Sequence, residues 1–503
     1  MAAASDRKTK MQDKTVTYNS IKSTGAFLLL TALVLAGCQS RQDYRHAPML
    51  EGRIVKPPEP NEPAPPHRPP AALPDDLQVD LHTAVQLALQ YNPELHIAKH
   101  EADITARQAD VARSAFFPQL SASATRLYLD DPVEFTVLDP PLIDPLVVRV
   151  IDKRINYAEL QAQWMLWDFG RTLGRYHQAQ FGSRAAHLQH TRVRQQLIYK
   201  TSEAYFDVLR AQAALDIADD ALTSARRQET LAERMFDQEL IPRTDVLRAR
   251  AQRIEFAQQK ISAQNSVRLA VAALNRQMGI PVSSPIQVVD HASIQAPVVS
   301  LRDALQKAVD NRPEFVQIQH AISAARSGAR AVRAEFLPEV FAAGSVRRLY
   351  DGHLLDQTRS MASIGIRMDL FTGGRRLAET EQAELRIRRS LASARQAADA
   401  IALQVHQAVL GIEDAWERLD VAEAGVDAAS ENRRLVRAQF REELVGSVEV
   451  ADAEAVMTRA RQSHAAAQYD YLQALQRLRF AVGTNEPEHE SQQRKQTHEN
   501  TDH

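Results

Sequence analysis

Two stretches of the chain repeat apolar residues in alternating steps of four and three, the spacing of a heptad seam. Every other seam residue is alanine: the seams are Ala204, Val208, Ala211, Leu215, Ala218, Leu222 and Ala225, then Ala408, Ile412, Ala415, Leu419, Ala422, Val426 and Ala429. Such a narrow seam lets helices approach closely over a long distance. It predicts long helices over 172–238 and 375–442, each about 100 Å long. Shorter helices are expected over 243–278 and 447–482, and a soluble coiled coil is the plain alternative.

Segments before the long helices alternate with a period of two, which predicts strands near 118–169 and 338–371. The apolar positions are Ala158, Leu160, Ala162, Trp164 and Leu166 in one segment, and Ala362, Ile364, Ile366, Met368 and Leu370 in the other. Aromatic residues fall near segment ends, as in the girdles of outer-membrane barrels: Tyr128, Tyr157, Trp164, Trp167, Tyr350 and Phe371. One face suits lipid and the other water, although an ordinary small sheet can alternate in the same way.

The order of these elements occurs twice along the chain. Leu81–Leu95 aligns without a gap with Leu301–Phe315, and Leu166–Arg171 aligns with Leu370–Arg375. The first copy is longer between Pro118 and Leu166, and the prolines and acidic residues within this insertion, from Asp131 to Pro145, predict a loop. The chain is therefore expected to be an internal duplication.

The N-terminal region has the layout of a lipoprotein signal peptide. Basic residues precede an apolar run, 26–36, which is too short to span a bilayer as a helix. The run ends in Leu-Ala-Gly-Cys, which resembles the bacterial lipobox, so Cys38 is the expected lipidation site; a buried cysteine is the alternative. Gln39 follows, which in lipoproteins implies delivery to the outer membrane. Translation can start at Met1 or Met11.

These signals divide the chain into six parts. They are a signal peptide over 1–37, a lipidated Pro-rich tether over 38–78, a first repeat over 79–280, a linker over 281–300, a second repeat over 301–483 and a polar disordered tail over 484–503. The tether and the tail are not expected to build a core.

Composition argues against two other classes of function. The formal net charge is −2, so the basic surface of a nucleic-acid binder is not expected. With one cysteine and no catalytic nucleophile motif, metal cluster or phosphate loop, the chain is expected to be no enzyme and to hold no cofactor. The triplet Asp168-Phe169-Gly170 lacks the companion motifs of a kinase and fits a strand that turns into a helix.

The whole pattern resembles the TolC-like outer-membrane factor family: helix, Asn92-Pro93, two strands, a long helix and another helix, all repeated. The resemblance covers about residues 79–483. It implies a fold that is mainly α with a membrane β part, in which a homotrimer closes a twelve-stranded β-barrel and a periplasmic α-barrel. It also implies an outer-membrane efflux or type I secretion channel, in contact with outer-membrane lipid, a periplasmic adaptor (membrane fusion protein) and an inner-membrane pump of RND or ABC type.

Oligomerisation also follows from the strands themselves. Four strands cannot close a barrel, and a bilayer does not tolerate open sheet edges, so several chains must pool their strands.

Site residues follow from the resemblance as well. The segments 236–247 and 440–452 match the helical tips that contact the adaptor, with Phe236, Asp245, Phe440 and Gly446 as contacts. Glu449 and Asp452 match acids that form a constricting ring at the periplasmic aperture in some members; a solvated helix face with ordinary acids is the alternative.

A periplasmic coiled-coil structural or adaptor lipoprotein without a pore remains the rival interpretation. It would share the anchor and the long helices but has no need of duplicated strands with an apolar face. The exported substrate and the identity of the pump are not encoded in recognisable residues of this chain.

Overall fold

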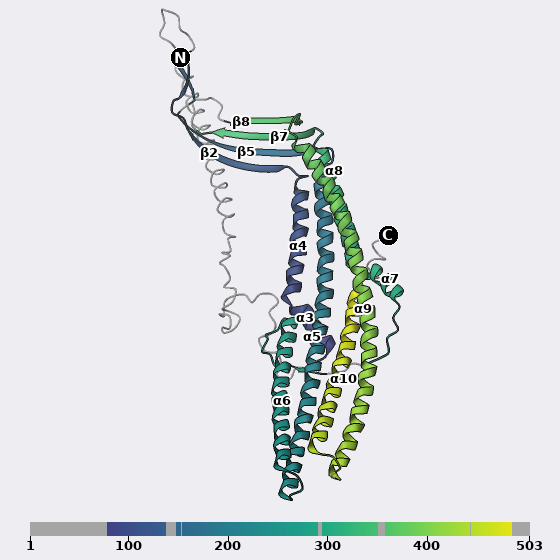
Figure 1. Ribbon diagram of the computed structural model, residues 1–503. Coiled ribbons are helices and arrows are strands. Elements are labelled where there is room, and N and C mark those ends of the chain that lie inside the picture. The colour runs from purple at the N-terminus through teal and green to yellow at the C-terminus, as the bar shows by residue number, and fades with distance from the viewer. Residues whose placement is uncertain are drawn as a thin grey trace, which may run out of the picture. The chain divides into compact units, whose positions relative to one another are not determined.

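The computed structural model describes residues 78–136, 147–151, 153–289, 294–350, 358–442 and 444–484. The described part consists of long helices and a four-stranded sheet that lies at one end of them (Figure 1). The predicted mainly α fold with a small β part is therefore confirmed. None of the helices in these ranges is long and apolar enough to cross a membrane. The expected signal peptide, Cys38, the tether and the tail fall outside the described residues.

Each repeat contains two short helices, a strand hairpin and two longer helices. The first comprises β1 (Gln78–Val79), α3 (Leu81–Tyr91), α4 (Pro93–Ser114), β2 (Gln119–Tyr128), β3 (Val133–Thr136), β4 (Val147–Ile151), β5 (Arg154–Trp167), α5 (Arg171–Asp237) and α6 (Arg243–Met278). The second comprises β6 (Gln287–Val288), α7 (Leu301–Asn311), α8 (Pro313–Ala334), β7 (Glu339–Leu349), β8 (Thr358–Arg367), α9 (Arg375–Arg441) and α10 (Ser447–Val482).

The duplication extends to the lengths of the helices. Corresponding helices have the same number of residues: 11 in α3 and α7, 22 in α4 and α8, 67 in α5 and α9, and 36 in α6 and α10. The repeats therefore differ in their strands and connections and not in their helical framework.

One expectation about the first repeat is corrected. Val133–Thr136, within the stretch expected to be a loop, is β3 and pairs antiparallel with β4. Valine, isoleucine, phenylalanine and threonine dominate this pair, and their preference for extended backbone outweighs the prolines and acids beside them. The first hairpin is thus longer than the second.

The four-stranded sheet is antiparallel throughout, in the order β2-β5-β7-β8. The pairing of β5 with β7 joins the hairpins of the two repeats. β2 and β8 form its edges. A separate parallel pair, β1 with β6, joins the start of the first repeat to the linker after it.

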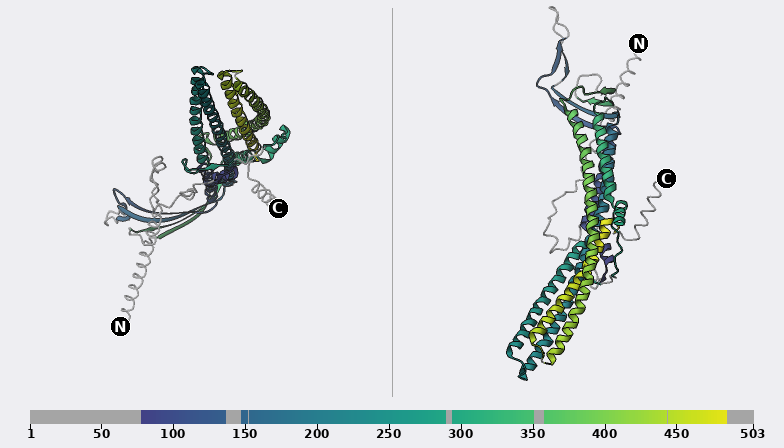
Figure 2. Two further views of the ribbon diagram at one scale, coloured as in Figure 1. Left: turned by 90° about the horizontal axis from the view of Figure 1, so that it is seen from below. Right: turned by 45° about the vertical axis from the view of Figure 1, so that its right-hand side comes forward.

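The helices pack along α5 and α9. α4 and α6 lie one after the other along α5, α8 packs against both α5 and α9, and α10 packs against both as well (Figure 1). The turns between α5 and α6 and between α9 and α10 lie together at the end opposite the sheet (Figure 2). All fourteen residues of the two predicted seams are buried or half-buried.

The largest hydrophobic cluster lies where the repeats meet, midway along the long helices. It joins Tyr205 and Phe206 of α5 to Ile412 of α9 and Leu472 of α10, with Val79 from β1. The Tyr205 hydroxyl donates to the Val289 carbonyl beside β6. From this cluster the long helices extend in opposite directions, to the sheet at one end and to the helical turns at the other (Figure 1).

Candidate functional site

The register of the sheet places apolar residues of all four strands on one face. These residues are Leu120, Ala122 and Ala124 of β2, Ala158, Leu160, Ala162 and Trp164 of β5, Val340, Ala342, Gly344 and Val346 of β7, and Ala362, Ile364 and Ile366 of β8. Several are strongly exposed, including Ile364 at 76%. A continuous exposed apolar surface of this kind needs a nonpolar environment or a partner.

The opposite face is polar. It carries Gln119, Ser121, Ser123 and Thr125 of β2, Glu159, Gln161 and Gln163 of β5, and Glu339, Ser345 and Arg347 of β7. Arg347 donates to the Glu159 carboxylate across the ladder at 3.0 Å. Glu339 pairs with Arg171 of α5 and with Arg367 of β8. The predicted division into an apolar and a polar face is present in the structure.

Aromatic residues mark both ends of the apolar face. Near the helices, Trp164 and Trp167 are exposed, and the Trp164 indole donates to the Phe116 carbonyl at 2.8 Å. At the far end, Tyr128 and Tyr350 are exposed. Tyr157 lies instead on the polar face, opposite Thr125 and Leu349, with the Arg347 guanidinium 5.0 Å from its ring.

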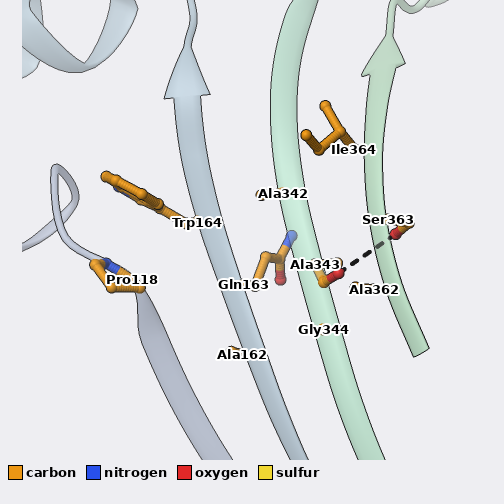
Figure 3. A pocket seen from close by; sticks show the side chains of 10 residues that line it. All are labelled: Pro118, Ala162, Gln163, Trp164, Ala342, Ala343, Gly344, Ala362, Ser363 and Ile364. Carbon is orange, nitrogen blue, oxygen red and sulfur yellow. Dashed lines mark hydrogen bonds between the residues drawn. The ribbon is translucent and has the colours of Figure 1, made fainter. Parts of the chain in front are cut away.

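A shallow hollow crosses the middle of the sheet. It is lined by small residues of β5, β7 and β8 with Pro118 and Trp164 at one end (Figure 3). Within it the Ser363 hydroxyl donates to the Ala343 carbonyl at 3.5 Å. The hollow has no charged group among its lining residues and forms part of the wall of the sheet.

The strand-to-helix turn at the base of the sheet is the Asp168-Phe169-Gly170 triplet. The Asp168 carboxylate accepts from the Gly170 N–H at 3.1 Å and from the Thr172 N–H at 2.7 Å, so it caps the start of α5. The kinase-like triplet is therefore a structural cap.

The tips expose apolar side chains at both turns. Leu240 follows Glu239, which has a left-handed backbone (φ 59°), and the Leu240 N–H donates to the Met235 carbonyl. At the second turn, Leu444 is 69% exposed and its N–H donates to the Gln439 carbonyl. The two turns therefore present leucine at equivalent places.

The four predicted contact residues are not equally accessible. Phe236 is 40% exposed, whereas Phe440 is only 4% exposed and lies inside the hairpin. Asp245 pairs with Arg248 at 3.3 Å, and Gly446 is exposed and precedes α10. Phe440 thus supports the tip from within this chain.

Glu449 and Asp452 lie in the first turns of α10. Both are exposed, on the side away from Val450 and Ala453, which are buried. A Cβ at Gly446 would lie 3.1 Å from Glu449 Oε2, so this carboxylate bends back over the positive end of the helix. The structure brings the two acids onto one side of one helix end.

Ion pairs connect the two hairpins near the tips. Glu454 of α10 pairs with Arg437 of α9, and the Arg437 guanidinium also donates to the Ser224 hydroxyl of α5 at 2.5 Å. Arg461 of α10 pairs with Asp220 of α5 at 3.1 Å. The hairpins of the two repeats are thus joined laterally within one chain.

A buried charged cluster at the start of α8 was not foreseen from the sequence. Glu314 pairs with Arg312 at 2.6 Å and with Arg192 of α5 at 2.8 Å. The Arg192 guanidinium lies 3.8 Å from the centre of the Phe480 ring. Burial lowers the pKa of Arg192 to about 10, with Arg312 adding to the decrease and Glu314 opposing it. In the sequence, the signals for this cluster were Arg192 and the Arg-Pro-Glu segment that begins α8 with Arg312.

Metal chemistry has no support in the described ranges. No group of three or more histidine, cysteine, aspartate or glutamate residues there is placed to hold a metal ion. The arrangement offers a two-faced wall at one end and paired acids beside apolar turns at the other.

Comparison with known proteins agrees with this arrangement. A family model described as "Outer membrane efflux protein" matches residues 84–280 and 304–484, one match for each repeat. The alkaline protease secretion protein AprF of Pseudomonas aeruginosa is 28% identical over 430 residues, covering 81% of this chain and 85% of the relative. The outer membrane protein TolC of Vibrio cholerae is 23% identical, covering 79% and 89%.

A solved structure has the same fold. The CmeC outer membrane channel of Campylobacter jejuni superimposes with a TM-score of 0.70 at 16% identity, covering 80% of this chain and 86% of the channel. Because the family model matches both repeats, the resemblance noted in the sequence is confirmed: this chain belongs to the outer membrane efflux protein family, whose members are channels of the outer membrane.

Proposed function

We propose that three copies of this chain form an outer-membrane channel that exports substrate received from an inner-membrane pump through a periplasmic adaptor. The observation that carries the proposal is the open four-stranded sheet with one apolar and one polar face. An apolar outer face and a polar inner face are the requirements for a wall between lipid and water.

The two free edges of the sheet support assembly with other copies. β2 and β8 expose unpaired backbone groups, which would be costly inside a bilayer. If β8 of one copy pairs with β2 of the next, the edges disappear, and three copies supply twelve strands.

The helices also carry apolar residues that one chain leaves uncovered. Exposed residues recur every seven positions on α4 and α6: Ile97, Ile104 and Val111, then Leu247, Ile254 and Ile261. On α9, Leu403 and Leu410 are exposed with the same spacing. Seven-residue stripes are the surfaces that helices bury against a neighbouring helix, so they support side-by-side packing of protomers in a periplasmic tunnel.

Protein export is the more specific form of the proposal. Its support is the similarity to AprF, whose name assigns it to secretion of an alkaline protease. Small-molecule efflux is the second candidate, supported by a relative named outer membrane efflux protein BepC, which is 25% identical over 237 residues.

The decisive experiment measures assembly and conductance together. The purified chain should have the mass of a trimer by light scattering in detergent and should open discrete conducting pores in planar bilayers. A monomer that forms no pore would overturn the proposal and favour the adaptor-like lipoprotein.

The acids at the tip are proposed to form a ring around the aperture. Three copies would repeat Glu449 and Asp452 around a narrow bore and attract divalent cations that obstruct it. Replacing both, Glu449→Gln with Asp452→Asn, should raise single-channel conductance and weaken block by Mg²⁺. Glu423→Gln with Asp427→Asn removes two exposed acids of α9 and is the matched control. Equal behaviour of the two double variants would argue against the ring.

Acylation of Cys38 is proposed as the membrane anchor, on the basis of the preceding Leu-Ala-Gly and the basic, apolar leader. Cells fed a labelled fatty acid should label the wild-type chain and not Cys38→Ser. Label retained by the variant would refute the site.

A further inference from the structure

Three arginines end the apolar face of the sheet on the side away from the helices. Arg126 of β2 lies opposite Asn156, Arg154 of β5 lies opposite Tyr128, and Arg348 of β7 lies opposite Ala158. The ladder thus places all three on the face that carries Leu120, Leu160 and Ile364. The three arginines lie in three successive rows of that face, and the first and third rows are about 13 Å apart along the strands.

No acid of β2, β5, β7 or β8 shares this face with them. The two glutamates of the four strands, Glu159 and Glu339, lie on the polar face, where each pairs with arginine. Arg126, Arg154 and Arg348 have no carboxylate within ion-pair distance among the described residues. Both glutamates of the polar face are therefore already paired, and among the described residues the three arginines of the apolar face have no counter-charge.

Tyrosines accompany two of these arginines in the same way in both repeats. The Arg126 guanidinium lies 5.4 Å from the centre of the Tyr128 ring, and that of Arg348 lies 5.7 Å from the centre of the Tyr350 ring. Each pair is an Arg-x-Tyr at the far end of the first strand of its hairpin. A ring with a cation beside it, at the edge of an apolar surface, is suited to the boundary between acyl chains and headgroups.

The connection to the helices identifies which boundary this is. α4 enters the sheet at Gln119 and α5 leaves it after Trp167, so the periplasmic side is the end near Trp164. The arginines lie at the other end, which in the proposed channel is the outer leaflet. Guanidinium groups bind phosphate through paired hydrogen bonds.

We propose that Arg126, Arg154 and Arg348 form a binding site for the phosphate groups of an anionic glycolipid headgroup in the outer leaflet. The inference rests on the proposed membrane position of the sheet. Arginine at a lipid-facing position is costly near the middle of a bilayer but not at its boundary, so the site would also fix the depth of the sheet.

The test compares the two faces of the sheet. Full-length wild type, purified in detergent, is titrated with diphosphoryl lipid A, and the bound fraction is measured by native mass spectrometry. Arg126→Gln with Arg348→Gln should weaken binding about tenfold, because two charge-assisted contacts are lost. The matched control, Arg347→Gln with Arg359→Gln, removes two charges from the polar face next to Arg348 and should change binding less than about twofold.

Three results would overturn the site. They are equal loss in the control variant, equal binding of dephosphorylated lipid A by wild type, and displacement of the lipid by an equimolar amount of inorganic phosphate. Conductance of the same preparations in planar bilayers separates this failure from failure of the channel itself. A conducting Arg126→Gln, Arg348→Gln variant that keeps full lipid A binding rejects the lipid site alone, whereas a non-conducting wild type rejects the channel.

Discussion

Each repeat has a bend between its first two helices, and different side-chain contacts hold the two bends. In the first, Asn92 separates α3 from α4, and in the second, Arg312 separates α7 from α8. Both bends pack against the C-terminal end of their own repeat, which closes with a left-handed glycine, Gly279 or Gly483. The comparison shows that duplication preserved the backbone path while the contacts that hold it changed.

The first bend is tightly packed around the uncharged Asn92, and its nearby acid, Glu94, forms a half-exposed ion pair with Lys200 of α5 at 3.3 Å. The Asn92 amide donates to the Gln277 carbonyl at 2.7 Å, and its oxygen accepts from the Glu94 N–H at 2.8 Å. A Cβ at Gly279 would lie 2.5 Å from the Tyr91 carbonyl carbon and 2.8 Å from the Asn92 nitrogen. Backbone lies against backbone here, with no room for a side chain.

The second bend is looser and depends on charge. A Cβ at Gly483 would lie 3.1 Å from the Asn311 backbone, which a small shift can accommodate. The Arg312 guanidinium donates to the Ala481 carbonyl at 3.3 Å and pairs with Glu314, which also holds Arg192. Close backbone packing in one repeat is replaced by a buried ion cluster in the other.

Alanine in place of the two glycines should give the largest difference between the bends. Gly279→Ala combines a left-handed backbone with a backbone clash and should cost about 3 kcal/mol or more. Gly483→Ala has the same strain but a softer contact and should cost about 1–2 kcal/mol. Thermal unfolding followed by circular dichroism at 222 nm checks the order, and equal losses would mean that the two bends are equally tight.

Removal of the shared carboxylate should be next in size. Glu314→Gln leaves Arg192 and Arg312 facing each other without a counter-charge and should cost about 2 kcal/mol, since the group is mostly but not fully buried. Arg192→Gln in the same background should restore part of the loss. An unchanged unfolding midpoint for Glu314→Gln would contradict the charge-dependent bend.

The Glu314 carboxylate should also make the stability of the protein depend on pH. Burial alone would raise the pKa of Glu314, but the hydrogen bond from Arg312 and the charges of Arg192 and Arg312 lower it overall. A depressed folded-state pKa stabilises the protein above the unfolded value, about 4.3, and this stability is lost as the pH falls through the lower folded value. Unfolding midpoints between pH 6 and pH 3 should therefore fall less steeply in Glu314→Gln than in wild type.

The smallest effect is expected at the first bend. Asn92→Ala removes a helix cap and one hydrogen bond to α6 and should cost about 1–2 kcal/mol, with no added dependence on pH. Asn92→Asp keeps the cap but loses the amide donor to Gln277. The aspartate variant should therefore fall between wild type and alanine, and a loss greater than that of alanine would show that the added charge dominates.

Periodicity predicted most of this architecture. The seam from Ala204 to Ala225 indicated a helix over 172–238, and α5 spans Arg171–Asp237. The alternation around Trp164 and Ile364 predicted the apolar face before any strand pairing was known. These features depend on local spacing, which a sequence displays directly.

Other features depend on contacts between distant parts of the chain. Phe440 matched a family tip contact, yet it turns inward because the hairpin buries it. Glu314 resembled an ordinary first-turn acid of α8 until the fold brought Arg192 beside it from 122 positions earlier (314 − 192). The sequence also does not show how the strands pair, so it could not predict that the arginines of β2, β5 and β7 share one face of the sheet.

The unlike edges of the sheet have a consequence for inheritance. In the proposed channel the two edges of the sheet differ, so β8 of one copy must pair with β2 of the next, and a closed ring uses both edges of every copy. A subunit in which one edge strand cannot pair would prevent closure of any ring that includes it. In a cell that makes equal amounts of the two chains, only about one in eight of the proposed trimers would contain no disrupted edge strand, so such an allele would be dominant.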